Sequence, residues 1–338
     1  MKPRRDEVEI TVLGKGYGES IVVHTGDGAW VIIDSFLEHR SRDPAPLAYL
    51  KSIEVDVERD VTSVVLSHLH ADHYEGIEHV MSECKSAWLY LPGVLPGHRW
   101  KEVLTHAGRL ATEPYRGLKK VSAAIQMAHG RSKLRIIGSD SEIETRLDSS
   151  LRCIGPTSAA LTADIFDNGI TADRVEKLIK QANYTSTVLW LRVGEARALL
   201  TADFDARDRH LGWTALMAEQ AAKHWIEEAS LVKVPHHGSL TAHRDEIYTK
   251  WATKPVAVIT GNRPNRLPNS DVVDKLRSLC AQVHHTSGPG PDGAASSDAH
   301  DGYASSADGP TGRVTARRRA SDTQWSITHG GSAWHDGP

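Results

Sequence analysis

Ligand-type side chains gather where the apolar run TSVVLS is followed directly by HLHADH. At strand spacing, His68 and His70 point to the same side, whereas Asp72 and His73 fall at the start of the next helix. All four side chains should therefore converge at one strand end. Imidazoles together with a carboxylate suit Zn²⁺, Mn²⁺ or Fe²⁺. The segment predicts a metal centre, and dividing the ligands into two sets would let two neighbouring ions share a hydroxide.

The elements that must position these groups alternate along the chain. Apolar runs between glycine turns predict strands, and wider apolar spacing predicts helices. The expected strands cover residues 8–13, 20–25, 29–34, 62–67, 87–92, 133–138, 150–155, 186–193, 196–203, 231–237 and 255–261. The expected helices cover residues 46–55, 75–84, about 108–129, 213–228, 243–253 and 270–280. Interleaving of this kind favours mixed sheets covered by helices.

One domain is expected over residues 1–338, with two halves at about 1–155 and 183–338. Residues 287–311 are rich in Gly, Ser, Ala, Pro and Asp and carry almost no branched apolar side chains. That composition cannot offset its own ordering entropy, so we expect a flexible surface loop there. The runs at 313–318 and 324–329 predict a C-terminal hairpin after it.

Composition limits the class of protein. The chain has 338 residues, 40 Lys plus Arg and 43 Asp plus Glu, and 40% of its residues are hydrophobic, so collagen, coiled coil and general disorder are excluded. Three scattered cysteines without a CxxC pair indicate a reducing compartment, and no apolar run is long enough for a membrane span. We therefore expect a cytoplasmic protein without a membrane partner. The formal charge of −3 means that any attraction for nucleic acid must come from local patches or a bound cation.

HLHADH resembles the HxHxDH signature of the metallo-β-lactamase superfamily. The resemblance implies the α/β (α+β) fold of that family, an αββα four-layer sandwich with two mixed sheets flanked by helices. It also implies that His68 and His70 bind a first metal ion, and Asp72 and His73 a second.

Other segments resemble the remaining ligand positions of the family. Asp34 ends the run VIID, where the family has an acid that orients the loop of the site. Asp203 ends ALLTAD and resembles the family's bridging carboxylate, although Ala202 replaces the usual Gly. In VKVPHHGS, either His236 or His237 would be the last ligand, and His237 is slightly favoured.

The strings GKGYGES, LLTAD and KVPHHGS resemble the hydrolase domain of ComEC-like competence proteins and their free-standing relatives, over most of residues 8–280. The β-lactamase branches carry an additional His before the bridging Asp, where this chain has Asn183, Tyr184, Thr185 and Ser186. The ComEC-like branch has an Asn- and Ser-rich segment there too. Asn183 and Ser186 are thus expected to support the site. The cofactors would be two divalent ions, Zn²⁺ or Mn²⁺, with a labile second ion plausible.

Hydrolysis is the reaction that such a site supports. Asp72 would hold a metal and orient the attacking hydroxide, while the member of the His236/His237 pair that is not a ligand would protonate the leaving oxygen. Ser239 follows the pair and could position a leaving group or only shape the loop.

Three functions are consistent with these residues. The resemblance favours a phosphodiesterase or nuclease acting on DNA, and it implies an anti-phage effector controlled by a protein partner; the oligomeric state stays open. The alternative is a small-molecule hydrolase for a cyclic nucleotide, phosphocholine-type ester or lactone, which the near-neutral charge favours. The third is a binding or regulatory module without turnover, against which the intact HLHADH, Asp203 and His-His residues argue.

Overall fold

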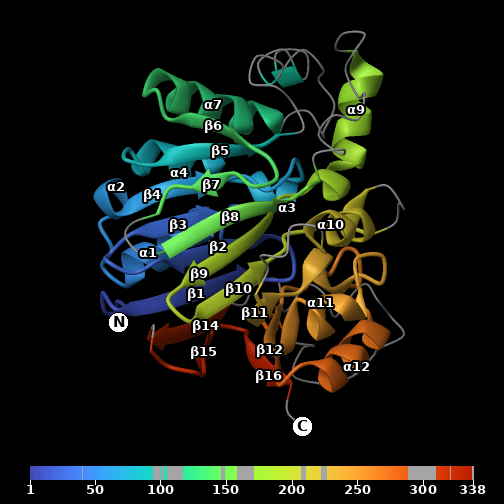
Figure 1. The fold of residues 1–338 in the computed structure, drawn as a ribbon. Helices are drawn as coiled ribbons and strands as arrows, with labels where there is room; N and C mark the ends of the chain where they lie inside the picture. The colour runs from blue at the N-terminus through green and yellow to red at the C-terminus, as the bar shows by residue number, and fades with distance from the viewer. Residues whose placement is uncertain are drawn as a thin grey trace.

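Two mixed β-sheets pack face to face in the computed structural model, and helices flank them (Figure 1). The structure describes residues 1–39, 41–93, 100, 103–104, 117–145, 149–157, 171–206, 211–221, 227–287, 310–319 and 321–336. Within these ranges each sheet has eight strands. The predicted αββα sandwich is therefore confirmed.

The first sheet has the order β15-β14-β1-β2-β3-β4-β5-β6. Its strands are β1 (Glu7–Gly14), β2 (Glu19–His24), β3 (Trp30–Ile33), β4 (Val61–Val65), β5 (Trp88–Pro92), β6 (Leu134–Ile137), β14 (Gly312–Arg319) and β15 (Ser326–Gly330). Strands β3 to β6 are parallel, whereas β2 is antiparallel to β3. The carboxyl ends of β3 and β4 therefore meet at the edge where β2 begins.

The second sheet has the order β16-β13-β12-β11-β10-β9-β8-β7. Its strands are β7 (Glu142–Ile143), β8 (Ser149–Gly155), β9 (Val188–Val193), β10 (Ala196–Leu200), β11 (Ala229–Lys233), β12 (Ala252–Ile259), β13 (Gln282–His285) and β16 (Trp334–Asp336). Strands β10 to β13 are parallel. The segments after β10, β11 and β12 consequently lie along one edge, where side chains from distant parts of the sequence can meet.

Alternation along the strands divides the apolar side chains among separate cores. In β2, for example, Ile21 and Val23 face the opposite sheet, and Val22 faces the helices. The middle core joins Ile10, Val31 and Val65 of the first sheet to side chains of the second, such as Leu191 and Val258. An outer core lies beyond each sheet, so the four layers follow from period-two patterning.

Helices cover both outer faces. Those packed on the first sheet include α1 (Ala45–Ser52), α4 (Ile77–Glu83), α7 (Leu118–Gly130) and α9 (Ala172–Lys180), with the short α2 (Val57–Asp60) and α3 (Ala71–Tyr74) beside them. Those packed on the second sheet include α10 (Gly212–Ala221), α11 (Asp245–Thr249) and α12 (Ser270–Leu279). Two 3₁₀ turns, η1 (Ala182–Thr185) and η2 (Pro235–Gly238), lie in the connections that carry candidate site residues.

The structure corrects several expected boundaries. The helix expected over 243–253 ends at Thr249, because Ala252 already pairs with Ala229 in the sheet. The strand expected over 231–237 ends at Lys233, since Pro235 opens η2. Elements α9, β7, β13 and β16 were not expected. The expected C-terminal hairpin is confirmed as the antiparallel pair β14 and β15.

Neither sheet is built from one of the two expected halves of the chain alone. Strands β7 and β8, which lie within residues 1–155, belong to the second sheet, and the C-terminal β14 and β15 close the edge of the first. A single domain over residues 1–338 stays a prediction. Most of the loop expected at 287–311 lies outside the described residues, as do residues 108–116 and 222–226 of two expected helices.

No helix in the described part of the chain is long and apolar enough to cross a membrane.

Candidate metal centre

The HLHADH segment follows β4 after two residues and turns into α3. His70 is the extended residue that precedes α3, and Asp72 and His73 lie in its single turn. The rings of His68 and His70 approach to 4.7 Å between centroids, and those of His68 and His73 to 4.2 Å. The four side chains therefore converge at a strand end, as the spacing predicts.

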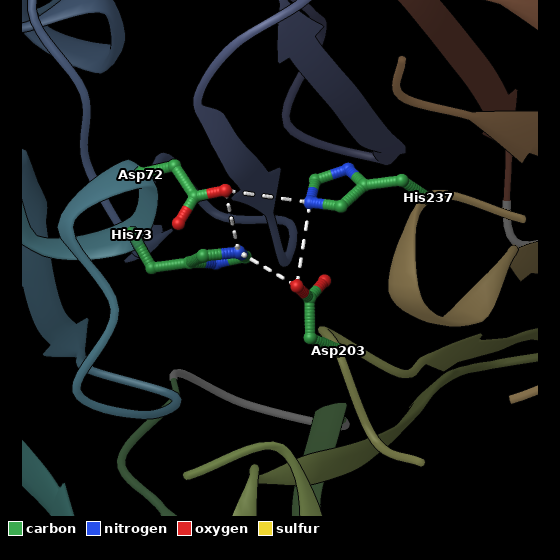
Figure 2. A group of neighbouring side chains, drawn as sticks. All are labelled: Asp72, His73, Asp203 and His237. Carbon is green, nitrogen blue, oxygen red and sulfur yellow. Dashed lines mark ion pairs between the residues drawn. The ribbon is translucent and has the colours of Figure 1, made fainter. Parts of the chain in front are cut away.

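Four side chains from three segments form a closed ring (Figure 2). Nε2 of His237 lies 3.6 Å from Oδ2 of Asp72 and 3.3 Å from Oδ2 of Asp203. Nε2 of His73 lies 4.0 Å and 3.4 Å from the same two oxygens. Two carboxylates and two imidazoles thus face a common centre, where one ligand atom from each could reach a single ion.

A second cluster adjoins the ring and shares Asp203 with it. His68, His70 and Asp203 each offer a ligand atom, all within 4.8 Å of one another. Nε2 of His68 lies 4.0 Å from Oδ2 of Asp203. Nε2 of His70 donates a hydrogen bond to the carbonyl oxygen of Ile179 at 2.9 Å. Because Nε2 carries the proton, Nδ1 of that ring is the atom that could bind a metal. Asp203 is common to both clusters, one of which contains His68 and His70 and the other Asp72 and His73. A third group, Asp34, His68 and His73, also lies within 4.8 Å.

Unpartnered buried atoms show that this donor set fits cations. Nε2 of His68, His73 and His237 and Oδ1 of Asp203 are buried without a hydrogen-bond partner among the described residues. Buried polar atoms in folded proteins are normally paired, because leaving one unsatisfied costs about 1–3 kcal/mol. Divalent ions bound by these nitrogens and by the carboxylates would satisfy them, and imidazole with carboxylate is a donor set suited to Zn²⁺.

Charge pairing dominates the electrostatics of the ring. Burial by itself raises the pKa of Asp203, but His237 and His73 outweigh it and hold that pKa well below its ordinary value. For Asp72 the same competition between burial and His73 lowers the pKa to about 2. Burial lowers the pKa of His237, yet Asp203 and Asp72 raise it to about 9. Without a metal the carboxylates are therefore ionised and the imidazole holds a proton, which a cation would displace.

Asp34 supports two of the imidazoles. Its Oδ2 accepts hydrogen bonds from Nδ1 of His73 at 2.8 Å and from the hydroxyl of Ser67 at 2.5 Å, and its Oδ1 accepts from the backbone N–H of Ser67 at 2.7 Å. The Ser67 oxygen in turn lies 2.9 Å from Nδ1 of His68. Because the oxygens of Asp34 are already engaged, its place is behind the candidate ligands His68 and His73, whose rings it fixes.

The structure distinguishes the two adjacent histidines. Both have left-handed backbone angles, with φ of 44° at His236 and 53° at His237, so their side chains leave η2 in different directions. His237 is fully buried in the ring. The side chain of His236 is 19% exposed, with Nε2 4.0 Å from Asp203 and Nδ1 3.6 Å from Asp205. This placement favours His237 as the ligand and leaves His236 beside the centre.

The three expected supporting residues have different neighbours. Nδ2 of Asn183 lies 3.1 Å from Nε2 of His236. The Ser186 hydroxyl accepts from the backbone N–H of Asp203 at 3.3 Å and lies 3.3 Å from Nδ1 of His68. Ser239 lies farther out and contacts the hydroxyl of Thr241 at 2.9 Å. Asn183 and Ser186 therefore touch site residues directly, whereas Ser239 shapes the loop.

Sequence reasoning assigned no role to three residues that contact the site. Asn262 donates to Oδ2 of Asp72 at 3.1 Å, Ser67 links Asp34 to His68, and Asp205 faces His236. Each stands at or just after the end of an apolar strand segment, and that position is the signal that could have found them.

The family follows from a sequence match combined with this geometry. Residues 13–261 match the metallo-beta-lactamase superfamily. The chain belongs to the metallo-beta-lactamase superfamily. It is thus a hydrolase of that superfamily, with side-chain clusters that could hold metal ions. No curated protein matches the sequence.

The chain is similar to several solved structures at low identity and low TM-score. The metallo-beta-lactamase fold protein YhfI from Bacillus subtilis is 11% identical with a TM-score of 0.43, covering 82% of this chain and 95% of that chain. Zn²⁺-bound PqqB from Methylobacterium extorquens is 14% identical with a TM-score of 0.38, covering 73% and 78%. MEM-A1, a subclass B3 metallo-beta-lactamase from a soil metagenome library, is 11% identical with a TM-score of 0.37, covering 80% and 89%.

Proposed function

We propose that this protein is a metal-dependent phosphodiesterase that cleaves DNA. The observation that carries the proposal is the position of Asp203, which belongs to both ligand clusters and so could bridge two cations. When bound, such a pair of divalent ions activates water and neutralises charge on a phosphoryl group. The ions would be Zn²⁺ or Mn²⁺, held by His68, His70 and Asp203 on one side and by the ring of Figure 2 on the other.

The side chains around the centre have separate tasks in this proposal. Asp72 orients the attacking water, and Asn262 holds the Asp72 carboxylate in place from the second sheet. His236 is the candidate that donates a proton to the leaving oxygen, because it lies beside the centre and is partly exposed. Asp205, 3.6 Å from Nδ1, would orient that ring.

The choice of DNA rests on the motif strings shared with ComEC-like hydrolases. In this chain the segment before Asp203 supplies Asn183 and Ser186, which bond to His236 and His68 in place of an additional imidazole ligand. That arrangement supports the ComEC-like branch over branches whose first metal site has three histidines. In-line phosphoryl displacement is a reaction that two-metal centres serve.

A cleavage assay tests the proposal. End-labelled single-stranded DNA, double-stranded DNA and RNA are incubated with Mn²⁺, Zn²⁺, Mg²⁺ or EDTA. The wild type should cut DNA in a metal-dependent manner, and Asp72→Ala should lower the rate about 10²–10⁴-fold. The matched control is Asp274→Ala, an exposed carboxylate paired only with surface Arg277 among the contacts described, which should cut normally. Full metal-dependent activity in Asp72→Ala would contradict the assigned role.

One observation favours a small-molecule hydrolase as the second candidate. Tyr17 and Leu240 are 44% and 51% exposed, and they lie on the loops that lead to Glu19 and from His237. Large uncharged side chains on such loops suit an apolar group of a lactone or phosphocholine-type ester, and they offer no positive charge to a DNA phosphate. A metal-loaded wild type that hydrolyses these esters or a cyclic nucleotide, but leaves every nucleic acid intact, would favour this candidate.

We further propose a cytoplasmic setting and control by a protein partner, on the resemblance to stand-alone defence effectors. Such control predicts that the purified protein binds metal at full stoichiometry but cuts DNA slowly. Fast cutting by the isolated protein would contradict control by a partner while supporting the nuclease.

A further inference from the structure

A buried chain of polar groups leads away from the far side of His237. The hydroxyl oxygen of Thr260 lies 2.9 Å from Nδ1 of His237, and the same hydroxyl is hydrogen-bonded to Oε2 of Glu19. The ammonium of Lys233 completes the chain, 2.5 Å from Oε2 of Glu19. All four side chains are at most 1% exposed.

The donor and acceptor capacity of each side chain determines where the protons lie in this row of hydrogen-bonded groups. Glu19 forms an ion pair with the Lys233 ammonium, and a carboxylate only accepts hydrogen bonds. Thr260 must therefore donate its single hydroxyl proton to Glu19. Its oxygen is left to accept, so Nδ1 of His237 carries a proton. The lone pair of the neutral ring is then on Nε2, the atom that faces Asp72 and Asp203.

The same order of groups recurs at the opposite side of the centre. There the Ser67 hydroxyl donates to Asp34 and accepts from Nδ1 of His68, so carboxylate, hydroxyl and imidazole follow one another again. In both cases Nε2 of the imidazole is buried without a hydrogen-bond partner among the described residues. Two independent copies of one arrangement behind two imidazoles indicate a role toward a bound cation.

The hydrogen-bonded side chains of Glu19, Thr260 and Lys233 also connect the two sheets. Glu19 opens β2 of the first sheet, whereas Lys233 ends β11 and Thr260 follows β12 of the second. The Lys233 ammonium additionally donates to the carbonyl of Ala202 at 3.0 Å, and Ala202 has a φ of 43°. Replacing a buried ion pair by apolar groups is often neutral for stability, so stability alone does not account for a charged pair here.

We propose that Glu19 and Thr260 are positioning residues that set the tautomer and ring orientation of His237 for a divalent cation, with Lys233 holding the Glu19 carboxylate. This inference rests on the metal centre of the proposed function and is independent of the substrate. Outer partners of this kind change metal affinity because they fix the ligand ring and raise its basicity.

The test uses the purified full chain, Co²⁺ alone as the probe, and no substrate. Thr260→Val removes the hydroxyl at constant shape, Thr260→Ser keeps it, and Thr25→Val removes a buried hydroxyl elsewhere, bonded to the carbonyl of Ala29. Thr260→Val should bind Co²⁺ about 10–100-fold more weakly than the wild type in competition with a chromophoric chelator. Thr260→Ser and Thr25→Val should bind within about threefold of the wild type.

A spectroscopic readout separates positioning from a general loss of packing. In Co²⁺-loaded protein, ligand imidazole N–H protons give exchangeable, strongly shifted proton resonances. Thr260→Val should shift the His237 Nδ1–H resonance or lose it to solvent exchange, and Thr260→Ser should restore it. Should Thr260→Val not fold, Glu19→Gln is compared by the same two readouts and should weaken Co²⁺ binding by a similar factor.

The outcomes distinguish this inference from the proposed function. Wild-type Co²⁺ affinity and an unchanged resonance in folded Thr260→Val would overturn the positioning role of Thr260 and Glu19, and would leave the metal centre standing. A wild type that binds no Co²⁺ would overturn the metal centre itself, and the inference with it. Absence of nuclease activity affects neither readout.

Discussion

Asp34 accepts a hydrogen bond from Nδ1 of His73 at 2.8 Å, and this contact joins the end of β3 to the helix that follows β4. Asp34 adopts a left-handed backbone with φ of 60°, which aims its carboxylate back across the sheet edge. The same carboxylate holds Ser67 and, through it, His68. One residue thus orients an imidazole of each cluster.

Asp34→Asn should weaken metal binding about 10–100-fold without unfolding the protein. Asn tolerates the left-handed backbone as well as Asp does, but its amide presents only one accepting oxygen to the three donors that Asp34 serves. Competition with a chelator measures the Zn²⁺ affinity, and the Tm of the metal-free protein shows whether the variant stays folded. Unchanged affinity would mean that Asp34 shapes the loop only.

Asp203→Asn should disturb both clusters at once, because Asp203 is the member that they share. We expect loss of more than one bound ion per chain and an affinity decrease larger than the roughly 10–100-fold typical of outer partners. Zinc content after gel filtration measures the stoichiometry, and Asp274→Asn is the surface control. Loss of only one ion would show that Asp203 does not bridge.

Variants of the two adjacent histidines should affect metal binding and turnover differently. His237→Asn should remove a buried ligand and lower metal affinity, whereas His236→Asn should keep the metal and lower kcat about 10²–10⁴-fold. Metal content and kcat are measured on both variants. The reverse pattern would exchange their roles.

Metal affinity should rise with pH up to about pH 9. Burial lowers the pKa of His237, but Asp203 and Asp72 outweigh burial and raise it to about 9, so a cation must displace a proton below that pH. We expect roughly a tenfold gain in affinity per pH unit for this proton. Titration calorimetry at pH 7 in buffers of different ionisation enthalpy measures the protons released; zero release would contradict the pairing.

The raised pKa of His237 also determines how the stability of the metal-free protein changes with pH. Because the folded-state pKa of His237 is raised, its contribution is fully present below the unfolded value of about 6.5. That contribution is lost as the pH rises through about 9. Chemical unfolding of metal-free protein between pH 6 and pH 10 should show this decrease, and stability that increases over the range would refute it.

Gly18→Ala should destabilise the protein by more than about 1 kcal/mol. Gly18 has a φ of 94°, and an added Cβ would lie 2.6 Å from Cβ of Phe36. Because Gly18 directly precedes Glu19, relief of the clash would also move the Glu19 carboxylate that lies behind His237 and Thr260. Urea unfolding measures the change; Gly28→Ala also has a positive φ, of 76°, but meets no atom within 4 Å, so it controls for backbone strain.

Local parts of the site were predictable. His68, His70, Asp72 and His73 lie within six consecutive positions, so strand-to-helix geometry alone brings them together. Alternation in runs such as SIVVH likewise predicts sheets covered on both faces, because period two divides the side chains between two cores. Short elements such as β13 and β16 were missed, since three or four residues carry too little pattern.

Contacts between distant segments depended on the tertiary structure. The choice of His237 over His236 follows from left-handed backbone angles in η2, which the string HHG does not reveal. The pairing of Glu19 with Lys233 and Thr260 requires the start of β2 to meet the ends of β11 and β12 across two sheets. By itself, the sequence determined the residue types, the layered fold and the candidate ligands that are neighbours in the chain. The packing of parallel strand ends decided which distant groups form hydrogen bonds and ion pairs. Such contacts need distances of a few ångströms, and the separation of two segments in the sequence does not define the distance between them in space.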